Sequence, residues 1–225
     1  MSLAEWQRDL VARVTAPSGA PPGPAGLALT RMLQRNWRYT RLTHALPLTM
    51  LALPAAGRDE LLADYCDVCP CVSFFPVHEA RSFAGYLARL PTPPPHVASI
   101  AAMEVALIDA FEADVFDDAA TPRPDARGTL RLARGASRVR FSAAPEQVLG
   151  AALAGRALPR TDATDHELLV APGIAGLARP PTAEERRLLD ACERGCADEL
   201  EASAAASLLG ERVLVRVVQG APGDE

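Results

Sequence analysis

Apolar side chains recur at helical spacing through the first 116 residues of the chain. Such spacing places them on one side of a helix, and it predicts helices over residues 2–14, 27–45, 58–68, 76–90 and 96–116. Proline and glycine mark the ends of these segments, because proline interrupts a helix and glycine favours turns. The pattern therefore predicts an N-terminal helical domain over residues 1–116.

The pattern changes in the second half of the chain. Residues 117–128 are rich in Pro, Asp and Ala and are predicted to be a linker. Residues 129–143, TLRLARGASRVRFSA, alternate apolar residues with arginine around a Gly-Ala-Ser turn, which is typical of a half-exposed β-hairpin. The apolar side chains expected to pack inward from this first hairpin are Leu130, Leu132, Val139 and Phe141.

A second hairpin and a helix–helix–strand unit follow. The segment HELLVAPGIAGLARP is predicted to turn at Pro172-Gly173, and a short helix after Pro145 precedes it. Thr182 and Glu185 have the spacing of a capping box, which opens the next helix. A second helix and the strand RVLVRVV then give a winged-helix-like order. The predicted fold class is α+β: the helical domain, a small antiparallel sheet with a winged-helix-like unit over residues 129–219, and a flexible tail at 220–225.

Composition points to a protein that stays in the cytoplasm. Hydrophobic residues make up 49% of the chain, but no apolar run approaches the roughly 20 residues that span a bilayer. The N-terminal segment MSLAEWQRDL carries Glu5 and Asp9 where a signal peptide has an apolar core. We therefore expect a cytoplasmic protein without membrane contact.

Cysteine is the first candidate for chemistry. Cys66, Cys69 and Cys71 are close enough in sequence to ligate zinc or an iron cluster, with Cys192 and Cys196 as further ligands. The second pair lies on a predicted helix–turn junction and not in a second metal knuckle. Free cysteine commonly acts as a small hydrophobic residue, so reduced structural thiols are the favoured interpretation. A Cys-ligated metal or redox protein is the alternative.

No catalytic motif accompanies these thiols. The 4 histidines lie in separate segments without the i, i+4 doublet of helical zinc hydrolases. The sequence also lacks a nucleophile elbow, a phosphate-binding loop and a dinucleotide-binding glycine pattern. A chain of this size without such motifs is usually a binding module, so we expect neither an enzyme nor a cofactor.

Positive charge is gathered in two places of an acidic chain. The net charge is −5, and all 23 basic residues are arginines. The helix at 27–45 contains no acid, and beside Trp37 it carries Arg31, Arg35, Arg38 and Arg41. The first hairpin carries Arg127, Arg131, Arg134, Arg138 and Arg140. Segregated arginine suits an acidic partner, although a solvated face is the simpler interpretation of either group.

The first hairpin suggests a way to hold a peptide. Arg138 and Arg140 are expected to face solvent from one strand. If that strand lies at a sheet edge, an extended peptide can join it through main-chain hydrogen bonds. The arginines would then bind acidic side chains of the peptide.

The helical half resembles a known family. The segments RNWRYTRLTHALPLTMLAL, LLADYCDVCP, FFPVHEARSFAGYL and VASIAAMEVALIDAFEAD are similar in order and rhythm to the N-terminal domain of a bacterial family labelled as a DNA-binding domain. Members of that group resemble the partner subunits of multinuclear non-haem iron oxidases, TIM-barrel enzymes that modify ribosomally made peptides, as in the methanobactin and thiaglutamate pathways. The resemblance implies an inward-facing glutamate in the last helix, here Glu104.

The resemblance also implies a function. The chain would be a non-catalytic accessory subunit in RiPP biosynthesis that forms a heterodimer with the TIM-barrel iron oxidase and holds the leader of a short precursor peptide. We expect Arg131, Arg138 and Arg140 to bind the peptide, and Arg31, Arg35, Arg38 and Trp37 to contact the enzyme.

A DNA-binding regulator is the second hypothesis, because the winged-helix order and the family label both favour it. Its predicted recognition helix, residues 197–209, carries Asp198, Glu199 and Glu201 and no arginine. A helix that enters the major groove is expected to be neutral or basic near its N-terminal end. The charge therefore argues against nucleic acid as the partner.

Overall fold

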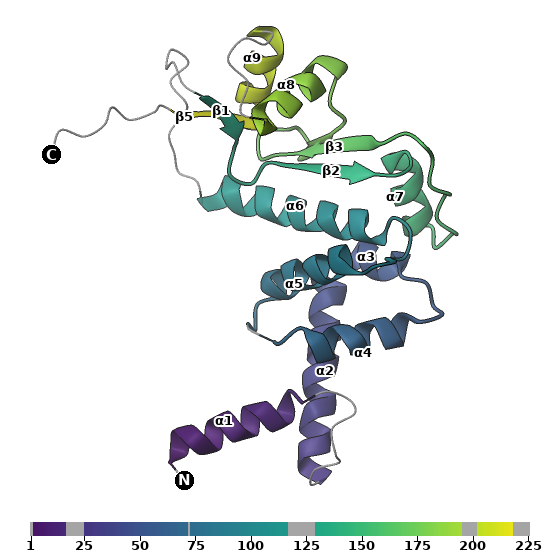
Figure 1. The fold of residues 1–225 in the computed structure, drawn as a ribbon, viewed down its shortest axis with the longest axis vertical. Helices are drawn as coiled ribbons and strands as arrows, with labels where there is room; N and C mark the ends of the chain where they lie inside the picture. Colours follow the sequence, from purple (N-terminus) through teal and green to yellow (C-terminus); the bar gives the residue numbers. More distant parts are fainter. Residues whose placement is uncertain (1, 17–24, 72, 117–128, 195–201, 218–225) are drawn as a thin grey trace, which may run out of the picture. The chain divides into compact units, whose positions relative to one another are not determined.

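The computed structural model describes residues 2–16, 25–71, 73–116, 129–194 and 202–217 (Figure 1). The chain divides into two units, of which unit 1 comprises residues 1–105 and 147–160, and unit 2 comprises residues 106–146 and 161–225. The division falls within helices α6 (Val97–Phe116) and α7 (Pro145–Leu153). The predicted linker at 117–128 and tail at 220–225 lie outside the described residues.

The predicted fold class is confirmed: helices α1–α6 are followed by small antiparallel sheets interleaved with helices. Unit 1 is built from α1 (Leu3–Val14), α2 (Ala25–Ala45), α3 (Pro47–Ala52), α4 (Arg58–Val68), α5 (Pro76–Arg89) and the first half of α6. Pro47 ends α2 and occupies the first turn of α3, where proline costs no hydrogen bond. The sequence pattern did not predict α3.

An aromatic cluster and a buried carboxylate organise unit 1. Tyr65 contacts Phe83 edge-on, with ring centroids 4.9 Å apart, and both side chains are fully buried. Glu104, 6% exposed, faces inward as the resemblance implies. Its carboxylate accepts hydrogen bonds from the backbone N–H groups of Leu48 and Thr49, each at 2.8 Å, and from the Thr49 hydroxyl at 2.6 Å. Glu104 thus caps the N-terminus of α3 across the core.

In the described residues of unit 2 the strands form two sheets, and their pairing contradicts the predicted first hairpin. The strands are β1 (Thr129–Leu132), β2 (Ser137–Phe141), β3 (His166–Val170), β4 (Ala178–Arg179) and β5 (Leu214–Val217). β1 pairs antiparallel with β5, whereas β2 pairs with β3, and β3 with β4. The segment predicted to fold back on itself therefore supplies one strand to each of two sheets.

The turn between β1 and β2 explains this difference. The N–H of Ala133 donates to the carbonyl of Val213 at 2.9 Å, which extends the β1–β5 pairing past the end of β1. Gly135 has φ 74°, and a side chain there would lie 2.5 Å from the Cβ of Ala113. The Gly-Ala-Ser turn is thus shaped by its approach to α6, and not by a tight hairpin.

The second hairpin and the capping box are confirmed. β3 and β4 pair with Leu169 opposite Arg179. A Cβ on Gly173, in their connection, would lie 2.5 Å from the backbone of Glu211, so only glycine fits this close approach. Thr182 and Glu185 form the predicted capping box at the start of α8 (Ala183–Glu193), and α9 (Ala202–Gly210) precedes β5. The predicted glycine break at Gly195 lies outside the described residues.

The core of unit 2 forms between the sheets and α8 and α9. It comprises Leu130, Leu169, Ala171, Ile174, Leu188, Leu189, Ala204, Ala205, Leu208, Val213 and Leu214. Three of the four inward residues predicted for the first hairpin are buried, but Leu132 is 37% exposed. In the described parts of the chain, no helix combines the length and the hydropathy that a membrane crossing needs.

Replacing Glu104 with alanine tests the cap of α3. Glu104→Ala leaves two backbone N–H groups and the Thr49 hydroxyl without their acceptor, so we expect the free energy of unfolding to fall by about 2–4 kcal/mol. Urea unfolding followed by circular dichroism measures this change. The control Glu60→Ala, at an exposed position of α4, should stay within about 0.5 kcal/mol of the wild type. Equal stability of the two variants would contradict the role of Glu104.

Candidate functional site

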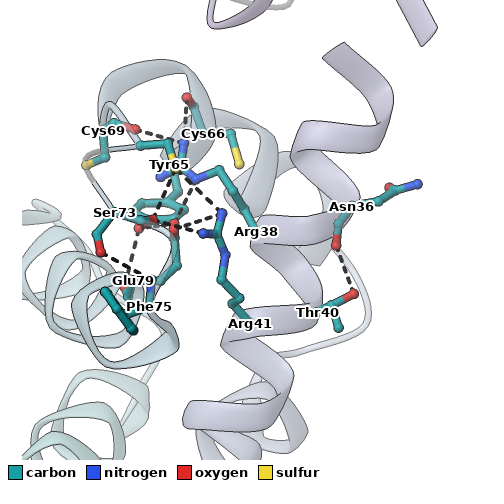
Figure 2. A network of polar contacts seen from close by, with 11 residues as sticks. Asn36, Arg38, Thr40, Arg41, Tyr65, Cys66, Cys69, Ser73, Phe75 and Glu79 are labelled. Atoms are coloured by element: carbon teal, nitrogen blue, oxygen red, sulfur yellow. Dashed lines mark hydrogen bonds and ion pairs between the residues drawn. The ribbon is translucent and has the colours of Figure 1, made fainter. Parts of the chain in front are cut away.

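Arg38, predicted to contact a partner enzyme, is instead buried in the core of unit 1. It is 1% exposed, and from α2 it points toward α4 and α5 (Figure 2). Its Nε donates to Glu79 Oε1 at 2.7 Å. Its Nη1 donates to the backbone carbonyls of Cys66 at 3.2 Å and Cys69 at 2.8 Å. The expectation that Arg38 belongs to a solvent-facing stripe is therefore wrong.

The Glu79 carboxylate interacts with two further groups besides Arg38. The Tyr65 hydroxyl donates to Glu79 Oε1 at 2.7 Å, and the Arg38 guanidinium lies 4.5 Å from the centre of the Tyr65 ring. Arg41 Nη2 lies 3.6 Å from Glu79 Oε2, and its Nη1 donates to the carbonyl of Ser73 at 2.9 Å. Two arginines thus share one buried carboxylate, and the network joins α2, α4 and α5 (Figure 2).

Burial and pairing set the protonation of this network. Burial has the largest single effect and lowers the pKa of Arg38, but the hydrogen bond to Glu79 and the electrostatic attraction of neighbouring groups together outweigh it and raise the net pKa. Burial also raises the pKa of the Tyr65 hydroxyl and of the Cys66 thiol. Arg38 therefore stays charged while Tyr65 and Cys66 stay neutral at neutral pH, which suits a structural network better than an acid–base catalyst.

The other three predicted contact residues of α2 are two arginines that pair within the chain and one exposed tryptophan. Arg31 donates from Nε to the carbonyl of Arg13 at 2.5 Å, at the C-terminal end of α1. Arg35 forms an ion pair with Asp67 of α4. Trp37 alone of the four predicted residues is exposed, at 64%. The structure thus gives the arginines intramolecular partners and leaves an aromatic side chain in water.

The cysteine cluster serves this network through its backbone. Cys66 and Cys69 are buried, and both carbonyls accept from Arg38. Cys71 is half-buried, and its Sγ lies 3.5 Å from Arg41 Nη2. Within the described ranges, no three His, Cys, Asp or Glu side chains are placed to hold a metal ion together. Cys196 lies outside those ranges.

Arg138, predicted to bind a peptide, is also turned inward. Its side chain is 5% exposed and donates to Glu167 at 2.7 Å, to Asp190 at 2.7 Å and to Glu193 at 2.9 Å. Burial has the largest single effect and lowers its pKa, but the hydrogen bonds to Asp190 and Glu167 and the charges of Glu167 and Glu193 together outweigh this effect and raise it. The expectation that Arg138 faces solvent is wrong, because α8 and β3 supply three carboxylates around it.

Arg140 does face solvent, as predicted, with 63% of its side chain exposed. Its Nε lies 3.6 Å from Glu167 Oε1, and Nε of Arg186 on α8 lies 3.3 Å from Glu167 Oε2. Arg131 is exposed as well, but it lies on β1 in the other sheet. The arrangement places two outward guanidinium groups, Arg140 and Arg186, beside the β2 strand.

Sequence reasoning did not identify the acidic centres of these networks, although signals for both exist. Glu79 shares a helical face with Phe83 and Leu87, at i+4 and i+8, and an acid on a buried face needs a cationic partner. Glu167 lies in the apolar strand HELLV opposite Arg140. Arg186 follows the capping box of α8 and gives no sequence signal of its own.

A third arginine, Arg179, connects three segments of unit 2. Arg179 of β4 donates to Glu185 through Nη1 at 2.8 Å and Nη2 at 2.6 Å, and through Nε to Glu211 at 3.0 Å. The hydrogen bonds from Arg179 lower the pKa of Glu185 to about 2. One guanidinium thereby ties β4 to the start of α8 and to the turn before β5.

The buried pair in unit 1 can be tested by mutation. Glu79→Gln leaves the charge of Arg38 buried without its counter-ion, so we expect a loss of about 3–5 kcal/mol in the free energy of unfolding. The double variant Arg38→Met/Glu79→Gln removes the stranded charge and should recover part of this loss. Chemical denaturation of the wild type, the single variants Arg38→Met and Glu79→Gln, and the double variant measures the coupling. Additive losses would show that the two side chains do not stabilise each other.

The low pKa of Glu185 predicts acid sensitivity of unit 2. The ordinary value of 4.5 applies to the unfolded chain, whereas the folded carboxyl takes up its proton only near pH 2. Acidification through this window favours the unfolded state, which binds more protons, so the contribution of Glu185 is present above pH 4.5 and is lost as the pH falls toward 2.

The matched variants are Glu185→Gln and Glu184→Gln, the second at an exposed neighbour. Glu185→Gln should lower the free energy of unfolding at neutral pH by about 2–3 kcal/mol and make its decline in acid shallower. Glu184→Gln should follow the wild-type profile. Parallel profiles for all three proteins would contradict the role of the Arg179–Glu185 pair.

Comparison with known proteins adds no relative on which these sites could be mapped. No protein-family model, no curated protein and no solved structure matches this chain. The geometry of its own residues therefore carries the functional argument.

Proposed function

We propose that this chain is a non-catalytic accessory subunit that holds an extended peptide along β2 and presents it to a peptide-modifying iron oxidase of TIM-barrel fold. The observation that supports this most directly is the place of β2 in its sheet. β2 is at one end of the order β2-β3-β4, and within the described residues it pairs with β3 alone. A strand in that position has one edge of N–H and C=O groups available to a further strand.

Charge beside this edge favours an acidic peptide. Arg140 and Arg186 are both exposed, and they lie at ion-pair distance from a single carboxylate, that of Glu167. Arg138 beneath them is already neutralised by Asp190 and Glu193 together with Glu167. The three guanidinium groups thus balance the three carboxylates in charge, and Arg140 and Arg186 keep 63% and 46% of their side chains exposed. A peptide carboxylate that bridges Arg140 and Arg186 would give both guanidinium groups a charge-assisted hydrogen bond.

The enzyme partner follows from the resemblance of the helical half. In this proposal the barrel supplies the iron and the chemistry, so the chain itself needs no cofactor. Trp37 is the predicted contact residue that remains exposed, at 64%, and tryptophan is enriched at the centres of protein interfaces. We therefore assign the docking of the oxidase to the Trp37 side of α2 and the holding of the peptide to unit 2.

Peptide binding can be measured with fluorescein-labelled synthetic copies of any short peptide that the neighbouring genes encode. We expect fluorescence anisotropy to show binding that weakens with added salt. The double variant Arg140→Glu/Arg186→Glu should raise the dissociation constant at least about tenfold, because it replaces two attractive charges with repulsive ones. The control Arg156→Glu changes an exposed arginine of unit 1 and should leave binding unchanged.

Amide hydrogen exchange locates the peptide independently. Strand addition predicts that amides of β2 exchange more slowly when the peptide is bound, while those of β1 and β5 keep their rates. Protection of β1 or β5 instead would contradict the assignment to β2. Absence of binding by every encoded peptide would contradict the proposed function itself.

A further inference from the structure

The side of α2 that faces water carries a stripe of large apolar residues. Leu29, Leu33 and Trp37 follow one another at i, i+4 and i+8, and their exposed fractions are 53%, 48% and 64%. Met32, 51% exposed, lies beside them. Figure 2 shows Asn36 and Thr40 on the side of α2 that lies opposite Arg38 and Arg41. We refer to Leu29, Met32, Leu33, Asn36, Trp37 and Thr40 as the outer face of α2.

This outer face carries no formal charge. Between Gly26 and Ala45 the exposed residues of α2 include no Arg, Asp or Glu, and His44 near the C-terminal end is their one titratable group. The arginines of the helix point the other way, toward the carbonyl of Arg13, Asp67 and Glu79. Charge depletion together with Leu, Met and Trp is the composition of an interface core and not of a solvated face.

A face without charge is electrostatically compatible with itself. Two identical faces that carry like charges repel each other, whereas two outer faces of α2 meet without any such cost. We propose that the occupant of this face is a second copy of the chain, bound about a two-fold axis that passes beside Leu33. In that arrangement Leu33 meets its own counterpart, and Leu29 of each copy contacts Trp37 of the other.

The form of unit 1 favours an antiparallel pair of α2 helices. Helices α3, α4 and α5 pack against α2 toward its C-terminal half, and the N-terminal half extends beyond them beside α1 (Figure 1). Antiparallel pairing places these bulky parts of the two units 1 at opposite ends of the helix pair. It also sets the two helix macrodipoles against each other, which is the favourable orientation. Ridges of i+4 residues pack into one another in this way in many globular proteins.

This association adds to the proposed function. Only its consequence, a competition between the second copy and the oxidase, rests on that function. Trp37 is the residue to which we assign docking of the oxidase, so a second copy and the oxidase would compete for it. The dimer would then be the form of the chain to which no oxidase is bound. Dimerisation of the chain can be measured without peptide or enzyme. Failure of the dimer proposal is therefore distinguishable from failure of the proposed function.

Sedimentation equilibrium of the full chain tests the pairing. We expect a mass that rises with concentration toward twice the 23.8 kDa of one chain. Leu33→Arg brings two positive charges together on the axis and should raise the dissociation constant of the pair at least about thirtyfold, the loss expected for a central hot spot. Leu153→Arg, at an apolar residue of α7 that is 66% exposed, is the matched control and should pair like the wild type. A wild type that stays monomeric at every concentration, whatever else binds the face, would overturn the inference, as would equal pairing of the two variants.

Cross-linking tests the register and does not depend on how Leu33→Arg folds. Under mild oxidation Leu33→Cys should form a disulfide with its own counterpart well beyond the background from the native cysteines of the wild type. Leu29→Cys alone should not exceed that background, whereas a mixture of Leu29→Cys with Trp37→Cys should. The opposite pattern, or no linkage in any combination, would overturn the antiparallel arrangement about Leu33.

Discussion

A guanidinium group that is buried away from water needs carboxylates or carbonyls as hydrogen-bond acceptors, and this constraint organises both units of the chain. Arg38 meets Glu79 and two backbone carbonyls in unit 1, and Arg138 meets Glu167, Asp190 and Glu193 in unit 2. Each group joins elements that are distant in sequence. The planar fork of arginine can satisfy several acceptors simultaneously, which a lysine ammonium does with less directional control. A chain whose basic residues are all arginine can therefore use its cations as internal connectors.

The inward position of these arginines changes the meaning of the sequence pattern. Four arginines on one helix without an acid suggest a basic surface, yet their partners come from α4, α5, the end of α1 and the segment at Ser73. The arginines are paired on one side of α2, and its large exposed apolar residues lie on the other side. The usual relation between an apolar inner side and a charged outer side is thus reversed along most of this helix.

Helices were predicted well because their signals are local. The bounds of α4 and the capping box of α8 agree with proline, glycine and Thr-x-x-Glu signals that lie within the same few residues. Helical spacing alone also predicts a buried stripe of Phe83, Tyr86, Leu87 and Leu90, of which the first three are buried and Leu90 is half-buried. Glu104 faces inward as the resemblance implied. In these segments local preference and tertiary packing favour the same structure.

Strand pairing and charge pairing could not be predicted in the same way, because both depend on distant residues. The first hairpin has an adequate turn sequence, but Ala133 and β1 pair with residues of β5 and its preceding turn. Arg138 is exposed in a hairpin considered alone and is buried once α8 brings Asp190 and Glu193 over it. The alternation of apolar residues with arginine in 129–143 is equally compatible with both outcomes. Only the position of the later helix distinguishes them.

The pairing of β1 with β5 has a consequence for how the protein is made. Thr129 lies opposite Val217, so the first strand of unit 2 has no partner until the intervening strands β2–β4 and helices α7–α9 have been translated. Unit 1 draws most of its residues from the early part of the chain and can assemble while the later part is still being synthesised. Until then β1, with Leu130 and Leu132, is an unpaired apolar strand, and such strands favour aggregation.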